Sequence, residues 1–272
     1  MQCETDEDCT KRGESFQGTE CIRSMCVKAD PIWGCMDKPQ PPAGPAEPHN
    51  VLVRATNIIS TLPPIAGAHV KLCNRIDTNP DPALDCQSPL SPPDLVTNEA
   101  GEATLTVNNN FTGYVAVFPP EKPGAPPADQ YVPGYYYFNP GVTSDMTVAT
   151  QIATFGLVTA LTGLLEAEQR DDRGLVLLNA LNCQGVGAAG VVFKSDGADD
   201  QTVTFYAQGS LPVKGLTATE ASGFGGFVNI EARLLTITGE VAETGRQMGS
   251  VSLVTRPKAI TYTRLVPIGQ PP

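Results

Sequence analysis

The sequence predicts an all-β protein: two tandem antiparallel β-sandwiches, preceded by a small disulfide-rich module and joined by one short helix. Three observations support this prediction. Gly and Pro occur 26 and 25 times among 272 residues, which suits many short strands joined by tight turns. Short β-branched runs with a period of two recur along the chain, and the same order of signals appears twice. The eight cysteines, an even number, indicate a disulfide framework.

Residues 1–35 are expected to form a disulfide-rich knot. They hold five of the cysteines with almost no apolar residue between them, so covalent links must supply the order that a core cannot. Among the pairings open to the first four cysteines, the spacing favours Cys3–Cys21 and Cys9–Cys26. A zinc site would need Cys-x2-Cys pairs or Cys/His spacing, which the sequence lacks, so we expect no metal here.

The other cysteines predict two long-range constraints. Cys73 and Cys86 flank a loop rich in Pro and Asp, and a bridge between them would stabilise the fold by roughly 3 kcal/mol. Cys35 and Cys183 then remain. If both are oxidised, they tie the knot to the second sandwich; the alternative is two buried free thiols.

A Pro-rich linker, residues 36–50, leads into the first sandwich, residues 51–150. Its composition predicts an extended, semi-rigid segment. Alternating apolar residues then predict strands at 51–55, 68–73, 95–97, 103–107 and 113–118. A tight turn is expected at 98–101.

The stretch from Val148 to Glu168 has helical spacing, which Gly156 and Gly163 weaken. We expect a short helix within a connector at residues 151–172, packed on the domain junction. A helix that binds a partner through its apolar face is the alternative.

The second sandwich is expected at residues 173–268, where the signals return in the same order. Residues 217–223 resemble the turn region 96–101, and the glycine-rich stretch 223–226 is explained by turn geometry. Strands are expected at 175–178, 187–193, 233–239, 249–254 and 259–266.

In both halves a turn of small residues precedes a β run, followed by a Thr-x-x-x-Gly turn and another strand. Ala66–Val70 and Ala189–Val191 carry the first part, and Thr97–Gly101 and Thr219–Gly223 the second. This pattern resembles the carboxypeptidase regulatory-like family, which implies Ig-like or transthyretin/CnaB-type sandwiches. A Cys-rich knot followed by such repeats resembles bacterial cell-surface lipoproteins, which implies a lipid anchor on a longer precursor.

The net charge and the expected compartment limit the kinds of partner that this protein can bind. The net charge of −11, without a basic cluster, disfavours nucleic acid and anionic membranes. No apolar run is long enough to be a transmembrane segment. Because the cysteines require an oxidising compartment, we expect an extracellular, cell-surface or periplasmic protein whose signal peptide has been removed.

Catalytic motifs are lacking, so we expect no enzyme and no cofactor. The two histidines, His49 and His69, lie in the linker and in a predicted strand, and no recognised hydrolase, zinc-protease or nucleotide-binding motif occurs in the required context. Asp77, Asp81 and Asp85 in the Cys73–Cys86 loop are a weak calcium candidate, because constrained carboxylates are the ligands that Ca²⁺ prefers. A solvated acidic loop is the alternative, as it is for Asp196, Asp199 and Asp200.

Tyr131, Tyr135, Tyr136 and Tyr137 form an aromatic cluster with two interpretations. If exposed, the rings would stack on sugars or form a protein-binding surface; if buried, they would fill the core of the first sandwich. We therefore predict a non-catalytic surface or structural protein that mediates adhesion or protein–protein assembly. A carbohydrate-binding accessory module, with surface polysaccharide as its ligand, is the alternative.

Overall fold

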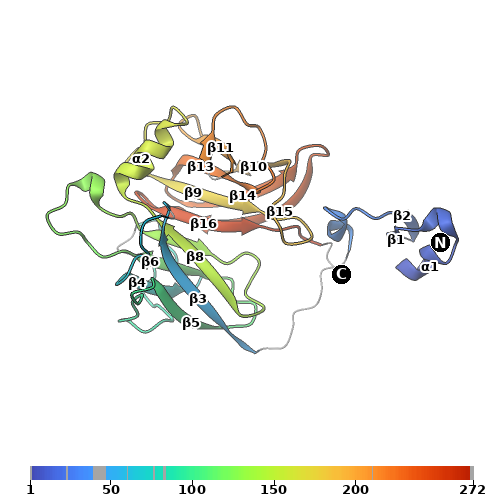
Figure 1. The fold of residues 1–272 in the computed structure, drawn as a ribbon, viewed down its shortest axis with the longest axis horizontal. Helices are drawn as coiled ribbons and strands as arrows, with labels where there is room; N and C mark the ends of the chain where they lie inside the picture. The colour runs from blue at the N-terminus through green and yellow to red at the C-terminus, as the bar shows by residue number, and fades with distance from the viewer. Residues whose placement is uncertain are drawn as a thin grey trace.

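The computed structural model describes residues 2–269 except 23, 39–46, 60, 76, 82–83 and 210, and leaves out the side chain of Asp37. The chain is all-β, as predicted, and its strands form two β-sandwiches beside a small N-terminal module (Figure 1). Most of the predicted linker lies outside the described residues. Its last residues belong to the first strand of the first sandwich.

The N-terminal module has little regular structure. It consists of helix α1 (Asp6–Thr10), the hairpin of β1 (Thr19–Ile22) and β2 (Met25–Lys28), and short 3-10 turns at Glu14–Phe16 and Gly34–Asp37. The predicted bridges Cys3–Cys21 and Cys9–Cys26 hold it together. Figure 1 shows the module projecting to one side of the sandwiches.

The first sandwich consists of two three-stranded groups. One is β5 (Glu102–Asn108), β3 (Pro48–Asn57) and β8 (Met146–Ile152), in that order across the sheet. The other is β4 (His69–Cys73), β6 (Tyr114–Phe118) and β7 (Gly134–Tyr137). A 3-10 turn, Pro127–Asp129, precedes β7.

The second sandwich repeats this plan. β13 (Phe224–Glu231), β9 (Arg173–Ala180) and β16 (Ile260–Leu265) correspond to the first group, and β10 (Val191–Ser195), β14 (Leu234–Val241) and β15 (Arg246–Val254) to the second. Two further strands, β11 (Val203–Gln208) and β12 (Leu211–Val213), extend the first group beyond β13.

The predicted internal repeat is matched by its turn hydrogen bonds. The hydroxyl groups of Thr97 and Thr219 each donate to a carbonyl in the turn that precedes β4 or β10. Each also accepts a hydrogen bond from the N–H at the start of that same strand. The carbonyls of Gly101 and Gly223 accept from Ala55 and Ala180, each at 2.8 Å. These bonds make Ala55 and Ala180 equivalent, and likewise Gly101 and Gly223.

The sandwiches share one sheet, which sequence analysis did not predict. β16 lies between β7 of the first sandwich and β9 of the second and runs parallel to both. The result is a mixed eight-stranded sheet with the order β12-β11-β13-β9-β16-β7-β6-β4. The sheets are therefore not purely antiparallel. In each repeat the last strand returns by a long connection and lies parallel to the first, as β8 does beside β3.

Both faces of the shared sheet are covered. One face packs with β5-β3-β8 around a core that includes Val53, Val115 and Tyr136. The other packs with β10-β14-β15 around a core that includes Tyr137, Val176 and Ile237. Strands buried on both faces carry continuous apolar runs instead of alternation.

The connector helix, α2 (Phe155–Gly163), is shorter than the helical spacing predicted. Val148–Ile152 is part of strand β8, because Val148, Thr150 and Ile152 are buried with a period of two. Thr154, two residues after the end of this strand, is the N-cap of the helix: its hydroxyl accepts a hydrogen bond from the N–H of Leu157 at 3.3 Å.

Two local predictions were wrong. Leu95–Thr97 is not a strand; it forms one bridge, from Val96 to His69, and covers the edge of β4 with loop hydrogen bonds. The glycine-rich stretch after Gly223 belongs to β13 rather than to a turn. Gly226 is required there, because a Cβ would lie 1.9 Å from the carbonyl oxygen of Val176 on the neighbouring strand.

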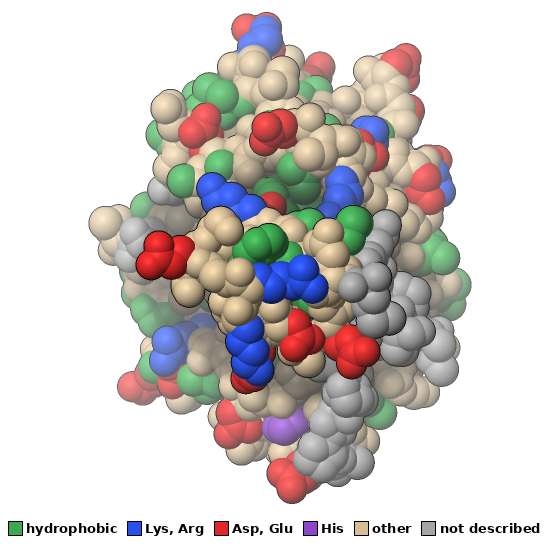
Figure 2. Space-filling view, turned by 90° about the vertical axis from the view of Figure 1, so that its right-hand side faces the viewer, with side chains coloured by type: hydrophobic (Ala, Val, Ile, Leu, Met, Phe, Trp, Pro, Cys, Tyr) green, Lys and Arg blue, Asp and Glu red, His purple; other side chains and the backbone are tan. Residues whose placement is uncertain are grey.

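No helix among the described residues is long and apolar enough to span a membrane. Figure 2 shows the side on which the N-terminal module lies, with acidic and basic side chains interspersed and hydrophobic ones in small groups. The described residues on this face form no continuous patch of one charge.

Candidate functional site

The predicted tyrosine cluster is buried. Tyr135, Tyr136 and Tyr137 are 1, 6 and 0% exposed, while Tyr131 is half-buried with the Lys122 ammonium 3.7 Å from its ring centroid. The three buried rings lie on β7 and alternate between the two cores. They are therefore core residues and do not provide the exposed row that the carbohydrate hypothesis required. Phe205 and Tyr206 of the second sandwich are buried as well.

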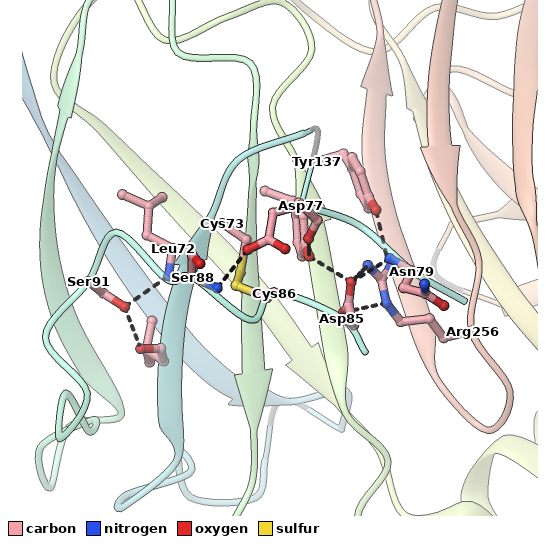
Figure 3. Close-up of a disulfide and its surroundings, with 12 residues drawn as sticks. Leu72, Cys73, Asp77, Asn79, Asp85, Cys86, Ser88, Ser91, Tyr137 and Arg256 are labelled. Carbon is pink, nitrogen blue, oxygen red and sulfur yellow. Dashed lines mark hydrogen bonds and ion pairs between the residues drawn. A yellow bond between two sulfur atoms is a disulfide. The ribbon is translucent and has the colours of Figure 1, made fainter. Parts of the chain in front are cut away.

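Asp85 also differs from the prediction. Its carboxylate forms two hydrogen bonds of 2.7 Å with the Arg256 guanidinium, from Nε to Oδ2 and from Nη2 to Oδ1 (Figure 3). Oδ1 also accepts from the Tyr114 hydroxyl and from the N–H of Asn79. These bonds remove Asp85 from the candidate calcium ligands, so that prediction now depends on Asp77 and Asp81.

Aromatic rings surround the Arg256 guanidinium. Its central carbon lies 4.0 Å from the ring centroid of Tyr135 and 5.0 Å from that of Tyr114, and Nη1 donates to the Tyr137 hydroxyl. Rings at these distances attract a cation through their quadrupoles. Because Asp85 lies in the Cys73–Cys86 loop and Arg256 follows β15, this ion pair links the two sandwiches.

All eight cysteines are in disulfides, so the free-thiol alternative for Cys35 and Cys183 does not apply. The bridge Cys73–Cys86 closes the loop that carries Asp85. The bridge Cys35–Cys183 joins the segment after the knot to the second sandwich, where the N–H of Cys183 also donates to the carbonyl of Ile32.

The remaining predicted site residues lie apart from one another. His49, on β3, is 3.3 Å from the Asn109 side chain, and His69 is exposed on β4. Asp199 forms two hydrogen bonds with Arg173, which lower the pKa of the Asp199 carboxyl far below its usual value. Asp77 accepts from the N–H of Ser88.

The candidate functional site is an apolar groove of about 540 Å³ between α2 and the shared sheet. One wall comes from Leu157 and Leu161 of the helix, and the floor from β9, β11 and β13. The residues after β3 and the edge strand β12 border it. Figure 1 shows α2 beside β9 and β13.

The floor of the groove is much less exposed than its rim. Leu177 and Val228 on its floor are only 6 and 1% exposed, whereas Ile59 and Leu211 at its rim are 42 and 59% exposed. Among the residues that the structure describes, no charged residue lines the groove. Its polar lining consists of neutral side chains: Gln151, Thr162, Asn179 and Ser222.

The sequence does not predict this groove, although it contains one signal of it. Leu175–Leu178 is apolar at every position, as in a strand buried on both faces. That run did not reveal what covers each face. The answer depends on α2 and β11, which are distant in sequence.

Comparisons with known proteins give no family. No known protein family matches the chain, and no curated protein does. The carboxypeptidase regulatory-like resemblance therefore stays a prediction.

Several solved structures are distantly similar in fold. The chain is 14% identical to GBS52, a minor pilin of Streptococcus agalactiae, with a TM-score of 0.25 and 82 and 99% of the two chains covered. For the shaft pilin SpaA of Lactobacillus rhamnosus GG the values are 10%, 0.23, and 82 and 100%. For the Bacillus anthracis TIE protein they are 10%, 0.25, and 81 and 34%, so the chain spans about a third of that protein. These similarities concern the β-sandwich fold alone.

Proposed function

We propose that this chain is a non-catalytic structural protein outside the cytoplasm, exposed at a cell surface, where it mediates adhesion or protein–protein assembly. The observation that carries the proposal is the bracing of the two sandwiches. The parallel pairing of β16 with β7 and β9, the Asp85–Arg256 ion pair and the Cys35–Cys183 bridge join distant parts of the chain by independent means.

Such bracing suits a protein that must keep its shape without folding assistance. Disulfides persist in oxidising compartments, which supports a location outside the cytoplasm. Interacting domains that move freely would need only a flexible linker, whereas a continuous sheet fixes their orientation. A lipid anchor on a longer precursor remains part of the proposal.

Location is tested on source cells. We expect an antibody against this chain to label intact cells without permeabilisation, and non-reducing peptide mapping of the extracted protein to recover the four disulfide pairs. Labelling only after lysis, or free cysteines in the extracted protein, would contradict the proposal.

Assembly is tested by cross-linking intact cells before extraction. A structural role predicts that the chain is recovered in covalent complexes with itself or another surface protein. Recovery as an uncross-linked monomer at the surface would leave location intact and contradict the assembly role.

A further inference from the structure

The groove occupies a face that the internal repeat makes comparable with the first sandwich. Because Ala55 corresponds to Ala180, and Gly101 to Gly223, each lining residue of β9 and β13 has a counterpart on β3 and β5. In the first sandwich, Arg54 and Glu102 form an ion pair of 2.8 Å on this face. In the second, their counterparts are Asn179 and Phe224, both of which line the groove.

The neighbouring positions differ in the same direction. Asn50 and Thr106 of the first sandwich correspond to Leu175 and Val228 on the groove floor. Leu52 and Leu177 are the exception, because this position is apolar in both repeats. Part of the apolar set packs in the core, since Leu175, Leu177 and Val228 share a buried cluster with Val158 of α2. Phe224 lines the groove where the first repeat has an ion pair.

A helix is a poor occupant of the groove. A helix with its side chains is about 10 Å wide, so a groove of about 540 Å³ would enclose only about one turn of it. A single hydrocarbon chain is much thinner.

An extended peptide is also a poor occupant. β9, β13 and β11 are interior strands, so their backbone groups are already paired on both sides. The adjacent edge, β12, has three residues with Pro212 at its centre, which has no N–H to donate. A peptide backbone buried here would lose its hydrogen bonds to water without replacement, whereas a hydrocarbon chain loses none.

The neutral lining determines the charge of the ligand. A buried carboxylate or ammonium would find no opposite charge among the described lining residues, and an uncompensated charge in an apolar site is costly. A neutral polar head has a partner in Asn179. Its Nδ2 donates to the carbonyl of Ser222, and its Oδ1 accepts no hydrogen bond among the described residues.

We propose that this groove binds the hydrocarbon chain of an uncharged single-chain amphiphile. The chain lies over Leu175 and Leu177, and a hydroxyl of the head donates to Asn179. This ligand site goes beyond the structural role proposed above and does not depend on it.

Titration calorimetry with monolauroylglycerol, below the concentration at which it aggregates, tests the proposal. We expect one molecule to bind per chain. Laurate has the same chain with a carboxylate head, and at neutral pH we expect it to bind about tenfold more weakly or worse, because its charge is not compensated. Absence of monolauroylglycerol binding, or equal binding of laurate, would overturn the proposal.

Variants place the ligand in the groove. Leu161→Glu and Leu211→Glu introduce a carboxylate at the helix wall and at the exposed rim, and each should weaken binding by about tenfold or more. Leu234→Glu is the matched control, because Leu234 is 63% exposed on β14 and does not line the groove. Binding unaffected by both groove variants, or equally weakened by the control, would overturn the assignment.

Folding of each variant is checked by circular dichroism. If Leu161→Glu does not fold, Leu211→Glu decides alone, since an exposed side chain tolerates the change. Binding of an uncharged apolar peptide with no binding of monolauroylglycerol would assign the groove to a protein partner and overturn the proposal.

Discussion

Arg256 and Asp85 are 171 positions apart in the chain and form a buried ion pair through two hydrogen bonds of 2.7 Å. Their side chains are 0 and 3% exposed. The pair connects the Cys73–Cys86 loop of the first sandwich to the segment that joins β15 and β16 in the second. Its hydrogen bonds therefore contribute to the junction of the two repeats.

Removal of one partner should be more harmful than removal of both. Asp85→Ala leaves Arg256 charged and buried without compensation, and we expect a loss of about 3–5 kcal/mol in the free energy of unfolding. Asp85→Ala with Arg256→Met should lose less, because no buried charge remains. Denaturant unfolding without reductant measures both. Asp171→Ala, which breaks the exposed pair with Lys258, is the control, with an expected loss of about 1 kcal/mol or less.

The long disulfide should stabilise the fold more than the short one through chain entropy. Cys35 and Cys183 are separated by 148 residues, and Cys73 and Cys86 by 13. Loop-closure entropy predicts that replacing both cysteines of a bridge by Ser lowers the free energy of unfolding by roughly 5 kcal/mol for the long bridge and roughly 3 kcal/mol for the short one. Denaturant unfolding measures both losses.

The short disulfide should also position Asp85, which adjoins Cys86. Asp85→Ala should therefore lower the free energy of unfolding less in the Cys73→Ser, Cys86→Ser background than in the parent. Equal cost in both backgrounds, by denaturant unfolding, would show that the disulfide does not position Asp85.

Alkaline pH should destabilise the protein through its buried tyrosines. Burial is the largest cause that raises the pKa of Tyr114, Tyr135 and Tyr262 above the ordinary value of 10.0. Well below pH 10 these hydroxyls are protonated in both the folded and unfolded states, so stability is unaffected. Above it, only the unfolded state ionises, and stability falls as the pH rises towards the folded-state values. Tyrosinate absorbance should therefore rise mainly together with unfolding; full ionisation while the fold persists would contradict this.

Gly223 should tolerate no side chain. Its φ is +68°, and a Cβ would lie 2.1 Å from the carbonyl oxygen of Ala180. The left-handed conformation and the clash together should cost about 3 kcal/mol in Gly223→Ala. Gly185→Ala is the control, because Gly185 has φ +74° with no atom near the added Cβ, and we expect about 1 kcal/mol. Equal losses in thermal or denaturant unfolding would show that the close approach to Ala180 is unimportant.

Local features of the sequence predicted much of the fold. Period-two runs located strands such as β3, β5 and β14, because alternation reports that a strand has one buried face. Cysteine number and spacing predicted the disulfide pairs. The Thr-x-x-x-Gly turns predicted the repeat, since the threonine hydroxyl and a glycine with positive φ form the same turn in each copy.

Tertiary structure decided what no local pattern encodes. A continuous run such as Tyr135–Tyr137 or Leu175–Leu178 indicates apolar surroundings, but not whether a second sheet, a helix or a groove supplies them. Asp85 is an ordinary loop carboxylate in the sequence, and its burial depends on an arginine from the other repeat. The insertion of β16 between β7 and β9, and with it the shared sheet and the groove, results from backbone pairing between distant segments. Backbone hydrogen bonds are available to every residue, so the side chains alone do not specify which strands meet.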